Sequence, residues 1–413
     1  MTQVTQAAFD ARVDFGRPNR DVAALVPAAV GSEIEIRLSF HDDLSEVEQE
    51  WRAFEDGADA TAFQTYDWLS TWHRHIGSRE GVKPAIVIGR HDGKILFVLP
   101  FALEPGALRR VRWLGAYLCN YSAPLLARDF SQRIGPPRFV RLWRDVQRLL
   151  RDRLRHDLLD LDKIPETIGE QANPMFALPM TRHANDAYLM HLPGNWDEYY
   201  AANRSSSRRR TDNKKRRRLA EFAEIQFSTA VDRADIETAI DALIEEKRCS
   251  YANLGVANMF EWPGYRDFFM DVACNPRRES LVHVSTVSAG ERIVAANFAL
   301  TFHGNYDYVL AGYDDGETAA CSPGTVHLQE LMRYCTERDF KTFDFNIGDE
   351  PYKHEWFDTE VKLFDHVVPM TLRGWGAMAL MRSLRMLKRF IKHHPSIWPA
   401  LRKARSIVGA LRR

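Results

Sequence analysis

The segment FDFNIGDEPYKHEW, residues 343–356, brings groups capable of acid–base chemistry together at the end of an apolar strand pattern. The apolar residues at 343, 345 and 347 alternate with polar ones, as in a half-buried strand. A loop between a glycine and a proline follows, and such a loop can direct neighbouring side chains to one point, where a helix would spread them around its axis. The candidate catalytic residues are Asp349, Glu350, Tyr352 and Lys353. A structural ion pair between Glu350 and Lys353 is the alternative.

A candidate anion site precedes this segment, at the start of a helix expected over residues 322–340. Proline preforms the first turn of a helix. Glycine lets a ligand approach the backbone, and the free N–H groups of a helix start favour an anion such as a diphosphate. The candidate cofactor-binding residues are Ser322, Pro323, Gly324 and Thr325. The alternative is an ordinary helix start.

The scaffold for these residues is expected to be α/β with two halves, because 413 residues are long for one core. Residues 33–190 contain a hairpin signal at Asp92-Gly93, then an amphipathic helix over 141–158 and a strand over 158–165. Residues 191–370 follow the same order, with turns of a strand meander expected at Ala289-Gly290 and Gly304-Asn305. We expect two tandem mixed-sheet halves between a flexible leader (1–32) and a basic tail (371–413).

Composition narrows the class of protein. The chain is 45% hydrophobic and 27% charged, with five scattered cysteines and no CxxC pair, which is typical of a reducing compartment. The first residues lack the apolar stretch of a secretory signal, and no run of 18 apolar residues predicts a membrane span. Histidines do not fall at metal-ligand spacing, so no metal is expected. These features predict a cytoplasmic protein.

The order of meander, SPGT turn, helix, strand and charged loop resembles the GNAT acyltransferase fold. More specifically, the chain resembles, over residues 40–368, the bacterial GNAT-like family of cellulose and exopolysaccharide biosynthesis (the CelD/BcsL type). The matching motifs are FQTYDWLSTW (63–72), LPFAL (99–103), RWLGAYLCNYSAPLL (112–126), SPGTVHLQELMRY (322–334) and FDFNIGDEPYKHEW (343–356). The resemblance implies two GNAT-like halves in tandem, as in the Fem-type peptidoglycan aminoacyl transferases.

The resemblance also implies transfer of an acyl group from acetyl-CoA or another acyl-CoA to an amino sugar, on a nucleotide-linked or lipid-linked saccharide. Such a reaction removes a proton from the amine and stabilises an oxyanion. Asp349 or Glu350 would take the proton, Lys353 would stabilise the intermediate or bind a phosphate, and Tyr352 would donate to the leaving thiolate. Tyr121 would line the acceptor cleft. Because the glycine pattern is reduced to CSPGT, aminoacyl-tRNA as the donor stays open, as does a non-catalytic subunit of polysaccharide synthesis that senses cyclic-di-GMP.

Residues 204–218, RSSSRRRTDNKKRRR, carry nine basic residues and one acidic residue. Nine positive charges in so short a stretch repel one another, so an anion is expected nearby. The candidate anion-binding residues are Arg204, Arg208 and Arg209. Acceptor or cofactor phosphates are the first expectation, and cyclic-di-GMP and RNA are alternatives.

The tail from Arg373 to Arg413 holds 11 basic residues and no acidic residue. On a helical wheel, Leu380, Leu384, Leu387 and Ile391 share one face. The opposite face is basic, with Arg382, Arg385, Lys388, Arg389 and Lys392, and Trp375 and Trp398 add interfacial aromatics. This pattern is typical of a helix on an anionic membrane surface, and residues 375–413 are expected to hold the protein peripherally on the inner face of the membrane. Packing of the apolar face on the protein body is the alternative.

Overall fold

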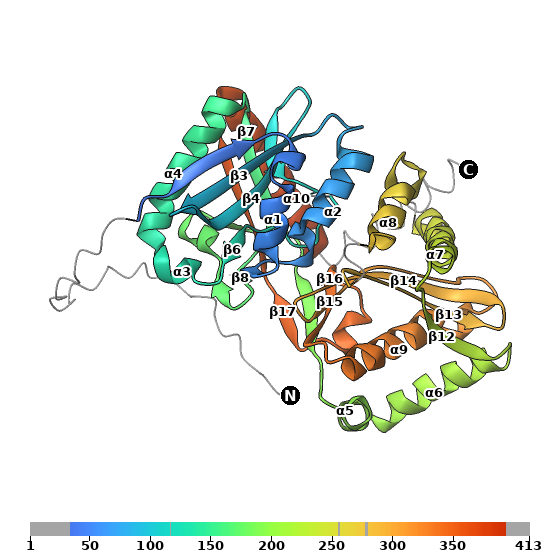
Figure 1. The fold of residues 1–413 in the computed structure, drawn as a ribbon. Coiled ribbons are helices and arrows are strands. Elements are labelled where there is room, and N and C mark those ends of the chain that lie inside the picture. Colours follow the sequence, from blue (N-terminus) through green and yellow to red (C-terminus); the bar gives the residue numbers. More distant parts are fainter. Residues whose placement is uncertain (1–33, 116, 255–256, 277–279, 394–413) are drawn as a thin grey trace, which may run out of the picture. The chain divides into compact units, whose positions relative to one another are not determined.

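The computed structural model describes residues 34–393 except 116, 255–256 and 277–279. The predicted leader, residues 1–32, and the tail from residue 394 onward lie outside the described residues. Two large mixed sheets with helices on their faces account for the described chain, so the α/β prediction is confirmed (Figure 1).

The first sheet has nine strands in the main order β1-β3-β4-β5-β7-β18-β10; off this path, β6 pairs with β4 and β2 pairs with β6. The strands are β1 (Arg37–His41), β2 (Ala58–Asp59), β3 (Lys83–His91), β4 (Lys94–Glu104), β5 (Arg110–Trp113), β6 (Leu125–Ala127), β7 (Leu158–Pro165), β10 (Thr181–Arg182) and β18 (Leu363–Pro369). The hairpin predicted at Asp92-Gly93 joins β3 to β4. A small separate hairpin consists of β8 (Thr167–Ile168) and β9 (Gln171–Ala172).

Helices cover both faces of the first sheet. They are α1 (Glu48–Glu55), α2 (Tyr66–Trp72), α3 (Phe130–Arg133), α4 (Pro136–Arg153) and α10 (Leu372–His393). The predicted amphipathic helix over 141–158 is α4, which begins earlier because Pro136 and Pro137 fit the first turn of a helix. Its apolar face packs against one side of the sheet. Phe63, Trp68 and Trp72, within the motif of residues 63–72, are buried on the other side.

The second sheet has seven strands in the order β12-β13-β14-β15-β16-β11-β17. They are β11 (Ala187–His191), β12 (Ile225–Thr229), β13 (Val282–Ala289), β14 (Arg292–Phe302), β15 (Asn305–Tyr313), β16 (Thr342–Ile347) and β17 (Thr359–Val361). β13, β14 and β15 form the expected antiparallel meander. The second turn of the meander is at His303-Gly304, one residue before the predicted position, because Phe302 pairs with Asn305.

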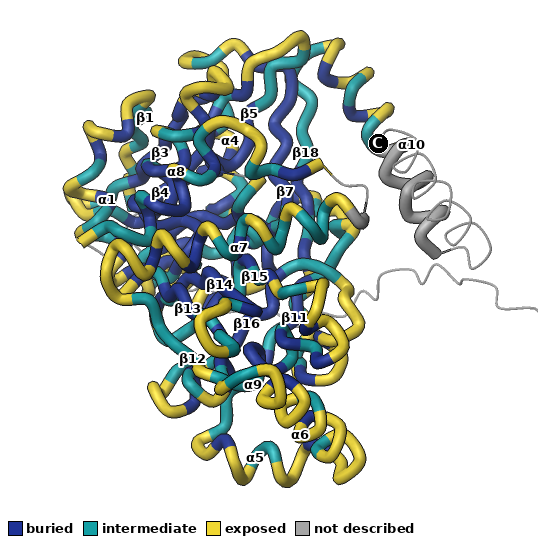
Figure 2. The backbone as a smooth tube through the Cα atoms, turned by 90° about the vertical axis from the view of Figure 1, so that its right-hand side faces the viewer, coloured by how far each residue is buried: buried dark blue, intermediate teal, exposed yellow. Residues whose placement is uncertain are grey.

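The helices of the second half are α5 (Trp196–Asn203), α6 (Ser206–Ala220), α7 (Arg233–Leu254), α8 (Tyr265–Ala273) and α9 (Pro323–Glu337). Figure 1 shows α9 and α6 on one side of the second sheet and α7 and α8 on the other. The strands in the burial view of Figure 2 are mostly dark blue, whereas α5 and α6 are largely exposed. α6 therefore presents most of its basic side chains to solvent.

The two sheets exchange strands along the chain. β18, from the predicted second half, pairs with β7 of the first sheet, and β10 pairs with β18 in turn. β11, which precedes the predicted division at 190/191, lies between β16 and β17 of the second sheet. The chain thus enters the second sheet at β11 and returns to the first at β18, so no single cut in sequence separates the sheets.

The predicted tail helix begins as α10, which follows β18 directly and packs on it through Met378. Leu372, Trp375 and Leu380 are exposed apolar side chains, with 90%, 58% and 61% of their surfaces accessible. The side chains of Arg382 and of residues 384–393, which carry most of the predicted amphipathic pattern, lie outside the described residues. Among the helices that the structure describes, none combines the length and apolarity needed to cross a membrane.

Candidate active site

An opening between two parallel strands is the main irregularity of the second sheet. β15 and β16 pair at only three positions, from Asn305 with Thr342 to Asp307 with Asp344. Both strands continue, β15 to Tyr313 and β16 to Ile347, without further pairing to each other. Beyond Asp307, β15 has no ladder partner on its β16 side among the described residues, so this edge of β15 is available to an extended ligand. The carbonyls of Asn346 and Ile347 on β16 already accept from Lys353 Nζ.

Asn346 is an unusual residue at this opening. Its φ of 61° lies in the left-handed region, which is uncommon outside glycine. The residue is buried, and neither its amide nitrogen nor its amide oxygen has a hydrogen-bond partner among the described residues. Strained backbone and unsatisfied buried polar groups concentrate at functional sites.

The N-terminus of α9 lies at the end of β15. Ser322 has left-handed backbone angles, Pro323 occupies the first turn, and a Cβ at Gly324 would lie 2.8 Å from the ring of Tyr313. Lys215 of α6 places its Nζ 3.4 Å from Thr325 Oγ1. The positive end of the helix and a lysine ammonium therefore face the same turn, which suits an anion. The sequence singled out the turn; Lys215 was one of nine basic residues with nothing to distinguish it.

Lys353 anchors the charged loop that follows β16. This lysine is buried, and its Nζ donates to the carbonyls of Asn346 at 3.0 Å and Ile347 at 3.2 Å. The third partner is the carboxylate of Glu350, at 2.8 Å. An ammonium has three N–H donors, so all are used. This geometry favours the structural ion pair over the predicted role of Lys353 in stabilising an intermediate.

The other predicted catalytic residues surround this lysine. Asp349 is about half exposed, and its Oδ1 lies 2.5 Å from His354 Nε2 and 3.4 Å from the hydroxyl of Tyr188. Tyr352 keeps 38% of its surface accessible, and burial raises the pKa of its phenol. The structure does not establish the proton acceptance predicted for Asp349 or the proton donation predicted for Tyr352. Both catalytic roles remain predictions.

Glu246 of α7 is a carboxylate that sequence reasoning missed. Its two oxygens are buried without hydrogen-bond partners among the described residues, and a Cβ at Gly312 of β15 would lie 2.6 Å from Oε2. Burial, reinforced by Asp314, raises the pKa of Glu246 to about 8. A carboxylate inside the helical run IEEKR looks like part of a solvated face, so only the packing of α7 on β15 reveals it.

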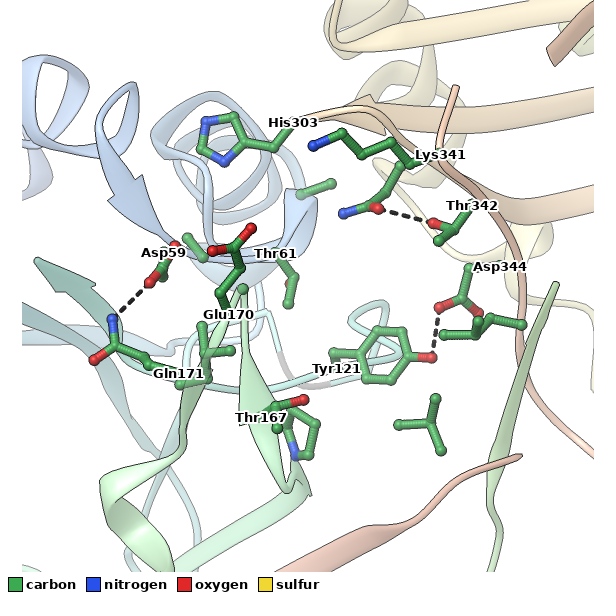
Figure 3. A pocket seen from close by; sticks show the side chains of 18 of the residues that line it. Asp59, Thr61, Tyr121, Thr167, Glu170, Gln171, His303, Lys341, Thr342 and Asp344 are labelled. Atoms are coloured by element: carbon green, nitrogen blue, oxygen red, sulfur yellow. Dashed lines mark hydrogen bonds between the residues drawn. The ribbon is translucent and has the colours of Figure 1, made fainter. Parts of the chain in front are cut away.

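A pocket of about 800 Å³ opens on the same strands, between residues of the first and second sheets. Figure 3 shows Asp344 facing Tyr121, whose hydroxyl donates to Asp344 Oδ2 at 2.6 Å. The backbone N–H of Asn346 donates to Asp344 Oδ1 at 2.7 Å. Burial raises the pKa of Asp344 to about 6, and burial and Asp344 together raise that of Asp307 well above its usual value.

The predicted position of Tyr121 at a cleft agrees with this pocket, whereas Asp307 and Asp344 were overlooked. In FDFN and NYDY they look like the outward residues of half-buried strands. The sequence signal was a charged residue at the start of each of two strands expected side by side. Its meaning depended on the parallel register, which pairs Asp307 with Asp344.

The predicted anion-binding arginines do not form one site. Arg204 is buried, its Nε and Nη2 bind Asp212 at 2.8 and 3.2 Å, and its Nη1 binds Glu355 at 2.8 Å. Two carboxylates thus already neutralise it. Arg209 donates to the carbonyls of Ala201 and Arg204 and caps the end of α5. Only Arg208 of the three is fully exposed, so the prediction for Arg204 is corrected: its partner is the protein's own acidic side chains.

The comparisons with known proteins agree with this geometry. Residues 206–354 match the family model described as the acetyltransferase (GNAT) domain. The chain is similar to the crystal structure of FemX, with a TM-score of 0.54 and 11% identity over 81% of this chain and 98% of that one. It is also similar to a conserved protein of unknown function from Bacteroides thetaiotaomicron, with a TM-score of 0.51 and 12% identity over 81% and 100% of the two chains. No curated protein matches.

Residues 206–354 are thus similar to a GNAT-type acetyltransferase domain, and the chain shares its fold with FemX. The matched segment runs from α6 to the charged loop and includes both the opening of β15 and β16 and the start of α9. The described residues contain no cluster of histidine, cysteine and carboxylate side chains that could hold a metal ion.

Proposed function

We propose that the protein is an N-acyltransferase that takes its acyl group, acetyl in the first instance, from acyl-CoA. The observation that carries the proposal is the opening between β15 and β16, which leads to the anion-favouring start of α9 within a GNAT-type domain. The donor pyrophosphate would bind the α9 turn and Lys215. The extended pantetheine arm would pair with the unpaired backbone of β15.

Two carboxylates near this opening would serve the reaction. The carboxylate oxygens of Glu246, beside Gly312, and the side chain of Asp344, beside Asn346, are buried, and both groups have raised pKa values, as expected of groups that exchange protons near neutral pH. The unpaired amide of Asn346 could donate to the oxyanion of the intermediate. The chemistry thus draws on strand and helix residues more than on the charged loop.

The acceptor proposed here is an amino sugar of a cell-surface polysaccharide precursor, and the place of work is the inner face of the membrane. The support for the acceptor is the resemblance of the sequence motifs to the exopolysaccharide family. The support for the membrane is the basic composition of the tail and the exposed apolar residues Leu372, Trp375 and Leu380 of α10.

Calorimetric titration of the full chain with acetyl-CoA tests the donor. The Lys215→Glu variant places a negative charge at the α9 turn and is expected to weaken binding at least tenfold, because it repels the pyrophosphate. Lys214→Glu is the matched control, since Lys214 is exposed on the same helix and lines a different surface. Absence of binding to the wild type would reject acetyl-CoA, and longer acyl-CoA donors and aminoacyl-tRNA would be titrated next.

A further inference from the structure

The pocket between the sheets contains two neighbouring carboxylates, an arrangement that favours binding of a cation. Asp307 and Asp344 are direct neighbours in the parallel register, and 5% and 7% of their surfaces are accessible. Like charges side by side on neighbouring strands are destabilising, and burial adds to the cost. The backbone of Asp307 belongs to the ladders with β14 and β16, but its carboxylate makes no hydrogen bond or ion pair with a described residue. No cation of the described chain therefore balances its charge.

The rest of the pocket lining is balanced in charge and rich in hydrogen-bonding groups. It includes Asp59 and Glu170 against Arg128 and Lys341, so the aspartate pair makes the whole lining net acidic. The neutral polar residues of the lining include Thr61, Gln171, Asn305 and Thr342. Amide and hydroxyl groups of this kind suit a ligand with several hydroxyls. The chemistry of the lining therefore selects a polyol that carries a positive charge.

Tyr121 is held in place by the first half of the chain. Its carbonyl accepts from Gln64 Nε2 at 2.9 Å, and the next residue, Ser122, donates its backbone N–H to the carbonyl of Lys163 at 3.1 Å. The ring is buried, and its hydroxyl reaches Asp344. This bond fixes one oxygen of the carboxylate and leaves Asp344 a defined orientation.

We propose that this pocket is the acceptor site, that it binds an amino sugar as its ammonium form, and that Asp307 anchors the ammonium while Asp344 accepts its proton. Tyr121 is a positioning residue for Asp344. The proposal rests on the acyltransferase function proposed above. It adds the location of the acceptor, its charge and the residues that recognise it.

The proposed step balances as follows. The ammonium gives one proton to Asp344, and the freed amine forms a C–N bond to the acyl carbon as the C–S bond breaks. The amide nitrogen loses its second proton, the thiolate gains one to become CoA thiol, and Asp344 returns its proton to solvent. Asp344 and Asn346 are two residues apart on β16, and the backbone N–H of Asn346 donates to Asp344 Oδ1 at 2.7 Å. That contact connects the pocket with the donor opening.

The test measures binding of an amine separately from binding of the donor. The full chain is titrated with glucosamine, with glucose as the uncharged control, and in parallel with acetyl-CoA. We expect glucosamine to bind at least tenfold tighter than glucose, and Asp307→Asn to lose that preference while acetyl-CoA affinity stays unchanged. Equal binding of the two sugars, or an unchanged preference in Asp307→Asn, would overturn the proposal.

Kinetic measurements distinguish the role of Asp344 from that of Tyr121. With glucosamine as the acceptor, Asp344→Asn is expected to lower kcat by about a hundredfold or more, the usual range for a lost general base. Tyr121→Phe is expected to lower kcat with little change in KM for glucosamine, because it orients the carboxylate without touching the ammonium. A kcat unaffected by Asp344→Asn, or displacement of glucosamine by Mg²⁺ or Ca²⁺ at the aspartate pair, would contradict the assignment. Loss of acetyl-CoA binding with glucosamine binding intact would instead reject the donor.

Discussion

The described part of the protein has two parallel strand pairs, β5 with β7 and β15 with β16. They share a local geometry but differ in what lies beyond their paired residues. Each follows an antiparallel meander, is connected through a helix, and pairs over only two or three positions. Each second strand carries a residue with left-handed backbone, Lys163 at φ 58° and Asn346 at φ 61°. The same local geometry thus appears once in each half.

The difference lies in what fills the space beyond the pairing. In the first half, the chain after β5 lies against β7: Lys163 Nζ donates to the carbonyl of Cys119 at 2.6 Å, and Ser122 bonds back to Lys163. In the second half, β15 and β16 do not pair with each other beyond Asp307 and Asp344, and the side-chain amide of Asn346 has no partner among the described residues. The comparison teaches that one opening has become core and holds Tyr121, while the other stays open to a ligand.

The largest expected effect concerns the buried lysine of the open half. Lys353→Met would leave the carbonyls of Asn346 and Ile347 and the carboxylate of Glu350 without their cation. We expect the free energy of unfolding, measured with urea, to fall by about 3–5 kcal/mol. Glu350→Gln, at a half-exposed partner, is the control and should cost no more than about 1 kcal/mol. Equal costs for the two variants would show that Lys353 is not the anchor of this loop.

An intermediate effect is expected where the closed half supports the open one. Gln64 is buried and holds the carbonyl of Tyr121, and it also accepts from Thr61. Gln64→Leu leaves these groups unpaired and should cost about 1–3 kcal/mol of stability. Because Tyr121 loses its support, kcat should fall while acetyl-CoA affinity is unchanged. Equal losses of kcat and of acetyl-CoA affinity would contradict the view that the first half supports Tyr121 while the second half binds the donor.

A smaller effect, dependent on pH, is expected from the aspartate pair. The pKa values of Asp307 and Asp344 are raised in the folded protein, so between the unfolded value near 3.8 and about 6 the folded state binds protons that the unfolded state does not. Stability therefore falls as pH rises through this window and stays at the lower level once both states have lost these protons. Asp307→Asn should raise the melting temperature by about 1–2 °C at pH 8 and leave it unchanged at pH 4. A rise at both pH values would indicate better packing instead.

The smallest effect concerns α10, which follows the strand that closes the first sheet. If α10 and the residues after it bind a membrane surface, the full chain should sediment with vesicles of phosphatidylglycerol and not with those of phosphatidylcholine. Trp375→Ser should weaken that binding about threefold to tenfold, since one exposed interfacial aromatic contributes about 1 kcal/mol. An unchanged affinity in the variant would leave the charges of the tail as the whole of the attraction.

The fold was predicted well because its signals are local. Alternation, hairpin turns and the start of α9 follow from a few adjacent residues, and these elements stand where the sequence indicated. The site was predicted only in part. Arg204 looked available because the sequence does not show that Asp212 and Glu355 neutralise it. For Lys353 the sequence left a catalytic role and an ion pair with Glu350 open, and the structure forms the ion pair.

The residues that were missed are those whose meaning depends on tertiary contacts. Asp307 and Asp344 become a pair only through the parallel register, and Asp344 meets Tyr121 only because segments 223 residues apart in sequence come together. Glu246 becomes a buried acid only through the packing of α7 on β15. Single-sequence patterns describe one strand or one helix at a time, and they do not report these partners.

The exchange of strands between the sheets has a consequence for how the protein is made. The first sheet has its early strands within the first 182 residues, yet β18, which lies between β7 and β10, is formed by residues 363–369. During synthesis the ribosome delivers the whole second sheet before it delivers this strand. Until β18 is synthesised, the edge of β7 in the nascent first half stays uncovered. An exposed strand edge of this kind can pair with a neighbouring chain. Newly made chains would complete both sheets almost together, once β18 has been synthesised.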